Sequence, residues 1–400
     1  MTNCSDTAAH AARLGAAWNA ALSSINLTTA TTRGLAHAAA PCAILAVGKC
    51  AGPMLDGARV LAPDVETLCV LPDGAPAPTA PSPLLRVAHP LPDVRVLNAA
   101  RQAMALAARA TAPRPLWLCL SGGTSACLGA PLQPAQLDLL GGVINRMMKA
   151  GADIEALNTV RKHACQVLGG RLGAAARGLV AAVTVDIAQQ DVSLVGSGPA
   201  YPDGTTLLDA RAVLERFSIH TPLALAPSPT CPRWPHHVVA SPATLQMALR
   251  DALGPHALVV APLLRTPHAF ETHVLDVALA RGGTVACVGE IVFPVPPEAP
   301  AGGRAAHLAV YVVLRLMRQH RTFVVLCAGS DGRDGPTQAA GACVTSETFA
   351  GVDPKVLEHA LAAGETHALL LAHGALLPRR DSPLNLLDGC VLWTPPGAQA

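Results

Sequence analysis

The sequence predicts a doubly wound α/β fold divided into two domains. The chain has 400 residues, which is more than one ordinary hydrophobic core accommodates. Short, continuously apolar runs, typical of parallel strands covered on both faces, alternate with stretches of helical periodicity. Between two such halves, residues 220–238 contain five prolines and no periodicity, which is typical of a linker. We therefore predict one domain over 1–235 and a second over 236–400.

The N-terminal half shows this alternation clearly. Apolar residues recur at helical spacing across 6–23 and predict an opening helix. A strand at 42–47 then ends at Gly48-Lys49, and a helix begins near residue 51. Apolar runs predict further strands at 66–71 and 116–120, and helical periodicity predicts helices at 96–110 and 133–148.

The C-terminal half repeats the pattern after a new strand and helix over 236–253. Apolar runs predict strands at 256–263, 284–293 and 323–329, and helical spacing predicts helices at 272–281 and 304–319. The chain is then expected to close with a β-rich ending, at 367–374 and 389–396.

Composition excludes several classes of protein. Hydrophobic residues make up 51% of the chain, so a disordered protein is excluded. The net charge is only +2 and no basic stripe is interleaved with aromatic residues, which argues against a nucleic-acid partner. The twelve cysteines include no C-x-x-C pair, so we expect buried free thiols rather than disulfides or a zinc site. With no signal peptide and no apolar stretch of about 18 residues, we expect a cytoplasmic protein without a membrane partner.

Three polar features suit an anionic ligand. The loop Ser121-Gly122-Gly123-Thr124-Ser125 joins a strand to a helix, and its N–H groups and hydroxyls can face a phosphate. A tight structural turn is the alternative for this loop. Arg161 could clamp a carboxylate or phosphate through two hydrogen bonds, unless its segment is an exposed helix start. Lys49 stands at the carboxyl end of a strand, where α/β folds bind ligands, although single lysines are also common at such surfaces.

Two groups of aspartates accompany these features. Asp186, Asp191 and Asp203 surround a Gly-Ser-Gly-Pro turn, and Asp331 and Asp334 lie in the loop 329–337. Carboxylates at strand ends hold Mg²⁺ or accept the proton of a hydroxyl group. Aspartates also form turns for purely local reasons, so the residues alone leave both interpretations open.

Taken together, these segments resemble the glycerate 2-kinases of the MOFRL type, a family that also includes proteins named hydroxypyruvate reductases. The matching segments keep the family's order and span nearly the whole chain: AVGKCAGPM, AHPLPDVRVL, LCLSGGTSACLGAP, LNTVRKHACQVLGGRL, DVSLVGSGPAYPDGTT, AGGRAAHLAV and GSDGRDGPTQAAGA. The resemblance implies a Rossmann-like N-terminal domain, a smaller α/β C-terminal domain and an active site in the cleft between them. It implies a kinase that transfers the γ-phosphate of ATP to the 2-hydroxyl of glycerate, with Mg²⁺ as cofactor.

The resemblance also implies a role for individual residues. The expected catalytic residues are Lys49, Arg161, Asp186, Asp191 and Arg304. The expected nucleotide-binding residues are Ser121, Gly122, Gly123, Thr124, Ser125, Glu290, Asp331 and Asp334. Asp191 and Asp331 are the expected magnesium ligands. The expected partners are glycerate and ATP, and a homodimer is compatible with the sequence.

The chain departs from the family pattern in places, which keeps two alternatives open. The family's Gly-Gly-Glu-Thr is replaced by Val288-Gly289-Glu290-Ile291, and a proline-rich stretch, 294–300, follows. One alternative is therefore a degenerate, non-catalytic ligand-binding homologue. The other is an NAD(P)H-dependent hydroxypyruvate reductase, although no G-x-G-x-x-G fingerprint follows the first strand.

Overall fold

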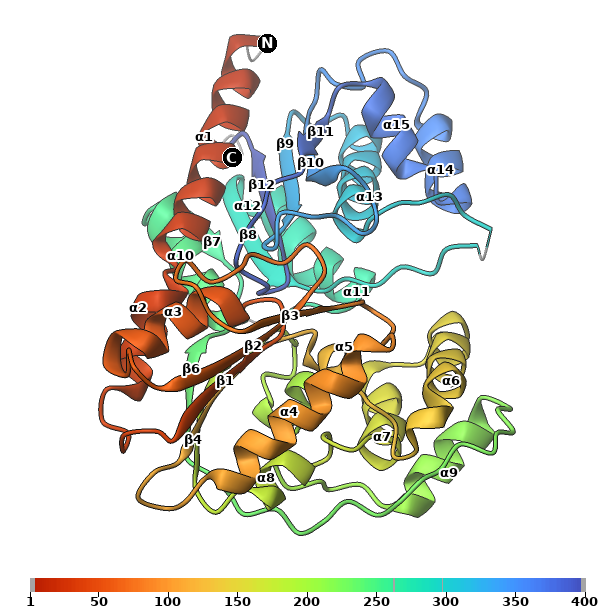
Figure 1. Ribbon diagram of the computed structural model, residues 1–400. Coiled ribbons are helices and arrows are strands. Elements are labelled where there is room, and N and C mark those ends of the chain that lie inside the picture. The colour runs from red at the N-terminus through yellow and green to blue at the C-terminus, as the bar shows by residue number, and fades with distance from the viewer. Residues whose placement is uncertain (1–3, 262, 297, 397–400) are drawn as a thin grey trace. The chain divides into compact units, whose positions relative to one another are not determined.

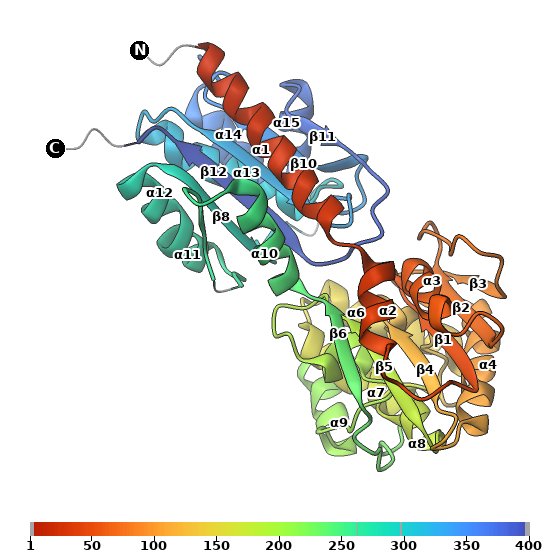
Figure 2. The same cartoon turned by 90° about the vertical axis from the view of Figure 1, so that its left-hand side faces the viewer.

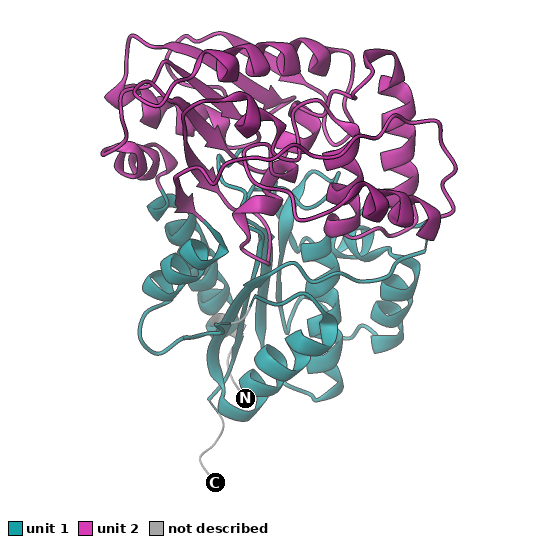
Figure 3. Ribbon diagram, turned by 90° about the horizontal axis from the view of Figure 1, so that it is seen from below, with its two compact units in different colours: residues 1–25, 241–400 teal, residues 26–240 magenta. Residues whose placement is uncertain are grey.

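The computed structural model describes residues 4–261, 263–296 and 298–396. The chain forms two compact units, which Figure 3 distinguishes by colour. Residues 26–240 form the central unit, and residues 1–25 together with 241–400 form the terminal unit. The predicted ranges 1–235 and 236–400 divide the chain close to one of these boundaries, but they group residues 1–25 differently.

The central unit is built on a fully parallel sheet of six strands in the order β3-β2-β1-β4-β5-β6. Its strands are β1 (Ala43–Val47), β2 (Glu66–Pro72), β3 (Leu84–Val87), β4 (Leu116–Leu120), β5 (Leu179–Thr184) and β6 (His236–Ala240). This is the strand order of the Rossmann fold, in which the direction of winding reverses between the first and fourth strands. The predicted Rossmann-like domain is therefore confirmed.

Helices cover both faces of this sheet (Figure 1). They are α2 (Leu27–Leu35), α3 (Ala51–Leu61), α4 (Arg95–Arg109), α5 (Thr124–Cys127), α6 (Leu137–Lys149), α7 (Ile154–Ala164), α8 (Arg171–Ala175) and α9 (Leu207–Arg216), with short 3₁₀ turns at Pro134–Gln136 and Val192–Ser197. Every residue of β1 and β4 is buried. This burial on both faces explains why the two strands are continuous apolar runs.

Two features of the central unit differ from the sequence-based expectations. Helix α2 was not predicted, because its sequence, LTTATTRGL, has few apolar residues. The proline-rich segment 220–238 packs within this unit and ends in the edge strand β6. For example, the Ala226 N–H donates to the His163 carbonyl over 2.9 Å, and the Trp234 indole donates to the Gly173 carbonyl over 3.0 Å.

The terminal unit contains a second six-stranded sheet, in the order β11-β10-β9-β12-β8-β7. Its strands are β7 (Leu258–Val259), β8 (Gly283–Gly289), β9 (Val324–Gly329), β10 (Ala339–Thr345), β11 (Leu376–Pro378) and β12 (Asp388–Thr394). Only β7 and β8 pair in parallel, so the expectation of parallel strands throughout is wrong here. Helices cover both faces of this sheet too, which makes its antiparallel strands as continuously apolar as parallel ones.

The helices of the terminal unit are α1 (Cys4–Ser24), α10 (Pro242–Leu253), α11 (Pro267–Phe270), α12 (Asp276–Arg281), α13 (Arg304–Arg318), α14 (Pro354–Ala363) and α15 (Thr366–Ala372), with a π turn at Glu271–Leu275. The predicted β-rich ending is therefore half wrong, since 367–374 falls on α15 while β12 is a strand. Leu370 on α15 is fully buried, and this apolar side of the short helix resembles a strand in sequence.

Helix α1 lies along one face of the terminal sheet (Figure 2). The His10 ring stacks on the Trp393 ring with 3.7 Å between their centroids, and the Arg13 guanidinium donates to the Thr284 hydroxyl over 3.2 Å. Trp18 packs over Gly389, where a Cβ atom would lie 2.3 Å from the indole. These contacts tie α1 to strands β8 and β12. Within the described residues, no helix is both long enough and apolar enough to cross a membrane.

Candidate functional site

Two loops of the central unit meet at the carboxyl ends of β1 and β4, where the winding of the sheet reverses. Gly48 has φ +105°, and a Cβ atom there would lie 2.5 Å from the Ser121 hydroxyl, so only glycine fits. The Lys49 N–H donates to the Gly122 carbonyl over 2.8 Å, and the Cys50 N–H donates to the Ser121 hydroxyl over 3.1 Å. Lys49 is thereby fixed beside the glycine loop at the position where doubly wound folds bind ligands.

The hydroxyls of this loop have different tasks. Ser121 is fully buried and donates to the Val47 carbonyl over 3.0 Å, and buried Thr124 donates to the Ser121 carbonyl over 2.7 Å. These two side chains therefore hold the loop in shape. Ser125 is half-buried and shares a hydrogen bond of 2.8 Å with the Ser197 hydroxyl. Of the three hydroxyls, Ser125 is thus the best placed to exchange its partner for a ligand.

Three basic side chains gather beside the glycine loop. A Cβ atom at Gly123 would lie 3.3 Å from Lys49 and 3.5 Å from the His89 ring, so both side chains flank this glycine. His89 is exposed as a whole residue, yet desolvation of its ring and the charges of Lys49 and Arg161 lower its pKa to about 4. The imidazole is therefore neutral near pH 7, and the remaining positive charge belongs to Lys49 and Arg161.

Arg161 is the unusual member of this group. It is half-buried, and desolvation lowers the pKa of its guanidinium. Among the residues that the structure describes, none forms a hydrogen bond or ion pair with this guanidinium. A desolvated charge without a partner is costly, so such an arrangement persists where a ligand supplies the opposite charge.

The neighbours of Arg161 on α7 are used for structure instead. The Lys162 ammonium lies 3.1 Å from the buried carboxylate of Asp203, which also accepts a hydrogen bond of 2.7 Å from Ser228. The His163 ring contacts the Thr205 hydroxyl at 3.2 Å. This network holds α7 against the segments around it and leaves Arg161 as the residue of the motif that is available to a ligand.

The two aspartates proposed to act on the hydroxyl group follow β5. Asp186 is half-buried and lies two residues beyond the end of that strand. Asp191 is exposed, and its carboxylate accepts a hydrogen bond of 2.8 Å from the Ser193 N–H as a helix cap. Asp191 is thus engaged in a local turn, although its carboxylate remains exposed.

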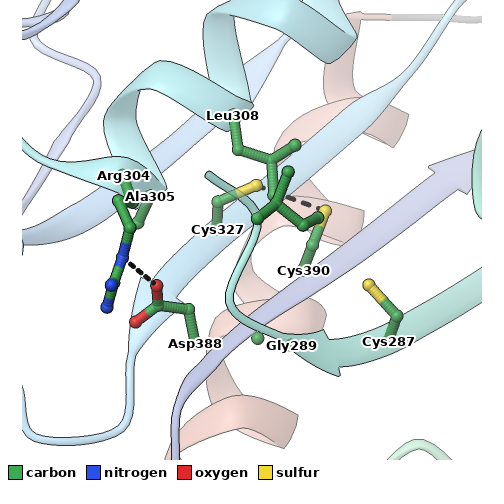
Figure 4. Close-up of a pocket in the computed structure, with 10 residues that line it drawn as sticks. Cys287, Gly289, Arg304, Ala305, Leu308, Cys327, Asp388 and Cys390 are labelled. Carbon is green, nitrogen blue, oxygen red and sulfur yellow. Dashed lines mark hydrogen bonds and ion pairs between the residues drawn. The ribbon is translucent and has the colours of Figure 1, made fainter. Parts of the chain in front are cut away.

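A second charged cluster, in the terminal unit, surrounds the first residue of α13. Arg304 pairs with the Glu290 carboxylate, and its Nε lies 3.2 Å from the Asp388 carboxylate (Figure 4). Desolvation raises the pKa of Asp388 to about 7, against the opposing charge of Arg304. Three further carboxylates contribute to this rise: Asp334, Glu290 and Asp331. The cluster therefore holds more acidic groups than one guanidinium can neutralise.

The predicted loop aspartates have different roles in this cluster. Buried Asp334 accepts hydrogen bonds from the Ala305 and Ala306 N–H groups over 2.9 and 2.8 Å, so it caps α13. Gly303 makes the cap possible, since a Cβ atom there would lie 2.0 Å from the Asp334 carboxyl carbon. Asp331 is half-buried and accepts a hydrogen bond of 3.0 Å from the Arg333 N–H. Asp334 thus positions Arg304, and Asp331 is the more accessible carboxylate.

Comparison with known proteins identifies the family. Residues 1–226 match a family model described as a domain of unknown function, DUF4147, and residues 284–388 match the MOFRL family. The D-glycerate 2-kinase of Thermotoga maritima is 29% identical over 326 residues, covering 75% of this chain and 77% of that protein. The glycerate kinase of Macaca fascicularis is 30% identical over 350 residues, covering 71% and 86% of the two chains. The chain belongs to the DUF4147–MOFRL glycerate kinase family.

A solved structure agrees with this membership. The crystal structure of the Thermotoga maritima glycerate kinase matches with a TM-score of 0.79 and 25% identity, covering 94% of this chain and 97% of that one. A protein of Agrobacterium vitis, provisionally named a hydroxypyruvate reductase, is 27% identical over 386 residues, covering 87% and 86% of the two chains. Proteins of similar sequence thus carry both of the names that the sequence suggested.

For this member of the glycerate kinase family, the sequence located most of both clusters. It missed His89 and Asp388. His89 lies in a segment that matches the family but belongs to no motif whose chemistry is readable from residue types. Asp388 is the first residue of β12, a strand that is otherwise mainly apolar, so its sequence gives little indication of a charged site.

The described part of the chain offers no complete metal cage. Among the described residues, no group of three or more His, Cys, Asp or Glu side chains is arranged to hold a metal ion. Mg²⁺ in phosphoryl-transfer enzymes usually keeps several waters and uses one or two carboxylates together with substrate phosphates. The half-buried carboxylate of Asp331 fits that mode of binding, in which the nucleotide supplies the remaining ligands.

Proposed function

We propose that this protein transfers the γ-phosphate of ATP to the 2-hydroxyl of glycerate and releases 2-phosphoglycerate. The observation that carries the proposal is the desolvated Arg161 guanidinium, which has no partner among the described residues and lies beside Lys49 and the glycine loop. Both substrates are small anions, and such a site is suited to a carboxylate or a phosphate. The names of the relatives specify which anions to test.

The central unit supplies the charge that phosphoryl transfer requires. The transferred group has little covalent chemistry to share with the protein, so catalysis depends mainly on positioning and on electrostatic stabilisation. Arg161 binds the glycerate carboxylate through its fixed pair of donors. Lys49 and the N–H groups of the 121–125 loop stabilise the phosphoryl oxygens. Asp186 orients the attacking hydroxyl group and accepts its proton.

The terminal unit supplies Arg304, which Asp334 and Gly303 position, together with the carboxylates of Glu290 and Asp331. We propose that these groups bind the nucleotide and its magnesium ion, with Asp331 as the ligand to the metal. When bound, Mg²⁺ neutralises negative charge on the phosphates and orients them. Asp191 remains a second candidate ligand, since its carboxylate is exposed.

No feature of the site favours the reductase. The first strand is followed by Gly48-Lys49-Cys50-Ala51-Gly52. In a dinucleotide-binding fold, glycines at this turn let the backbone approach the pyrophosphate closely, but here the turn carries the charged side chain of Lys49. The Agrobacterium name therefore defines a control experiment rather than a second proposal.

The test is incubation of the purified full chain with glycerate, ATP and Mg²⁺, followed by ³¹P NMR of the products. We expect ADP and 2-phosphoglycerate in equal amounts, and neither product when ATP or glycerate is left out. The Arg161→Met variant is the matched control for contaminating kinases, and it should form little product. The proposal is wrong if wild type yields no phosphoglycerate but oxidises NADH or NADPH steadily with hydroxypyruvate.

A further inference from the structure

Three cysteines form a row across the terminal sheet. Cys390 on β12 stands directly opposite Cys287 on β8 and directly opposite Cys327 on β9. Directly opposed residues point to the same face of a sheet, so all three thiols lie on one side, as Figure 4 shows. All three are buried, and the Cys327 and Cys390 sulfurs are 3.2 Å apart.

This row lies next to the charged cluster around Arg304. Asp388 precedes Cys390 by two residues, so both side chains point to the same face of β12. The thiols, Arg304 and Asp388 line one pocket that encloses only about 10 Å³. That is room for about one water molecule, so the thiols are covered while the Arg304–Asp388 ion pair is in place.

We propose that Cys327 and Cys390 form a reversible disulfide that switches off the charged cluster beside them. The oxidant is a hydroperoxide. One sulfur attacks the peroxide oxygen, the O–O bond breaks, and a sulfenic acid and an alcohol (water, from hydrogen peroxide) are formed. The second thiol attacks that sulfenic sulfur, the S–S bond forms and water leaves. Two thiols thereby give two electrons and two protons to one hydroperoxide.

The geometry selects this pair of the three. A disulfide has its sulfurs about 2.05 Å apart, so the observed 3.2 Å must shorten by roughly 1 Å. Both residues are on neighbouring strands in register, so the closure requires no change in pairing. Burial raises the pKa of Cys327, and the hydrogen bond with Cys327 together with burial raises the pKa of Cys390, so both thiols stay protonated and react slowly while the pocket is closed. Oxidation should therefore be slow and should depend on opening at Arg304.

The functional consequence rests on the proposed kinase activity. Forming the disulfide moves the two sulfurs about 1 Å closer, and we expect this shift at Cys390 to displace Asp388, two residues away, and with it Arg304. A misplacement of this size in a catalytic site can lower the rate by about 10²-fold. The disulfide should therefore reduce kinase activity strongly without unfolding the protein.

The experiment treats the full chain with hydrogen peroxide, blocks remaining thiols by alkylation and searches tryptic digests for the Cys327–Cys390 linked peptide. We expect that peptide, a parallel ten- to hundred-fold loss of activity, and recovery of both after dithiothreitol. Cys327→Ala should keep its activity under peroxide, whereas Cys287→Ala, from the same row, should lose activity as wild type does.

Each part of the proposal can fail separately. Absence of the linked peptide in a folded, oxidised sample overturns the disulfide, whatever the enzyme's activity. A linked peptide with unchanged activity overturns the switch. If untreated wild type has no kinase activity, the proposed function is wrong, and the peptide alone still decides whether the disulfide forms.

Discussion

Replacing Arg161 by methionine should raise stability and strongly lower activity. Its guanidinium is half-buried and has no partner among the described residues, so the folded protein bears its desolvation cost. The desolvation cost is several kcal/mol for a fully buried ion. It is about 1 kcal/mol for Arg161, because this side chain keeps some contact with solvent. Methionine fills the space of the aliphatic stem without the charge. We therefore expect the free energy of unfolding of the central unit to rise by about 1 kcal/mol.

Activity should change in the opposite direction. Truncating one partner of a desolvated charge pair typically costs about 2 to 5 kcal/mol of binding, which corresponds to about a 30- to 5,000-fold loss in kcat/KM. A residue that lowers stability and supports catalysis belongs to the site rather than to the core.

Arg171 is the matched control, because it is half-buried in the same unit but its guanidinium forms hydrogen bonds with the protein. Its guanidinium donates to the carbonyls of Lys162 and Ala226 over 2.6 and 3.1 Å, and to those of Leu168 and Pro227 over 3.3 and 2.9 Å. Arg171→Met removes these four hydrogen bonds and should cost about 3 kcal/mol of stability.

Both variants can be compared by hydrogen exchange in peptides from β4 and β5, which report on the central unit alone, and by the coupled kinase assay. The reasoning is refuted if Arg161→Met destabilises the unit as Arg171→Met does, since Arg161 would then have a structural partner. Wild-type activity in Arg161→Met would equally remove it from the site.

Three further predictions follow from the two clusters. Lys49→Ala should lower kcat by about 10²-fold, as the loss of a preorganised charge does, while exposed Lys149→Ala should leave the steady-state rate unchanged. Because the pKa of Asp388 is raised to about 7, its contribution to stability is present below its ordinary pKa and is lost as the pH rises to about 7. In Asp388→Asn, the decrease in the free energy of unfolding between pH 4 and pH 7 should be smaller than in wild type by up to about 4 kcal/mol. The prediction fails if urea unfolding gives the same pH dependence of this free energy for the variant and the wild type. Gly303→Ala places a methyl group 2.0 Å from the Asp334 carboxyl carbon and should lower the melting temperature, which differential scanning calorimetry would measure.

The sequence predicted the central fold well because its signals are local. Continuous apolar strands and periodic helices alternate there, and the parallel Rossmann order is the usual way to bury both. The terminal sheet was less predictable. Its strands β8, β9 and β12 have the same continuous apolar character, but their antiparallel pairing depends on how the chain connects them, which residue patterns do not encode.

The site was predictable in residue type but not in role. Lys49, Arg161 and the glycine loop were found through motifs, and the structure places them together. Asp334 was predicted to bind nucleotide, a role that remains untested, and the structure shows that its carboxylate caps a helix. A sequence shows that an aspartate is present but not which N–H group it faces, so this role required coordinates.

The position of α1 has a consequence for synthesis of the protein. This helix leaves the ribosome long before strand β12, which carries its stacking partner Trp393. The central unit, 26–240, can fold in between, because a large cluster of its core is formed by its own residues. During that interval the apolar side of α1, with Leu14 and Trp18, has no native surface to cover it. A nascent chain of this protein therefore carries an exposed amphipathic helix until the rest of the terminal unit has been made, which makes α1 a natural contact for chaperones and the place where premature association would begin.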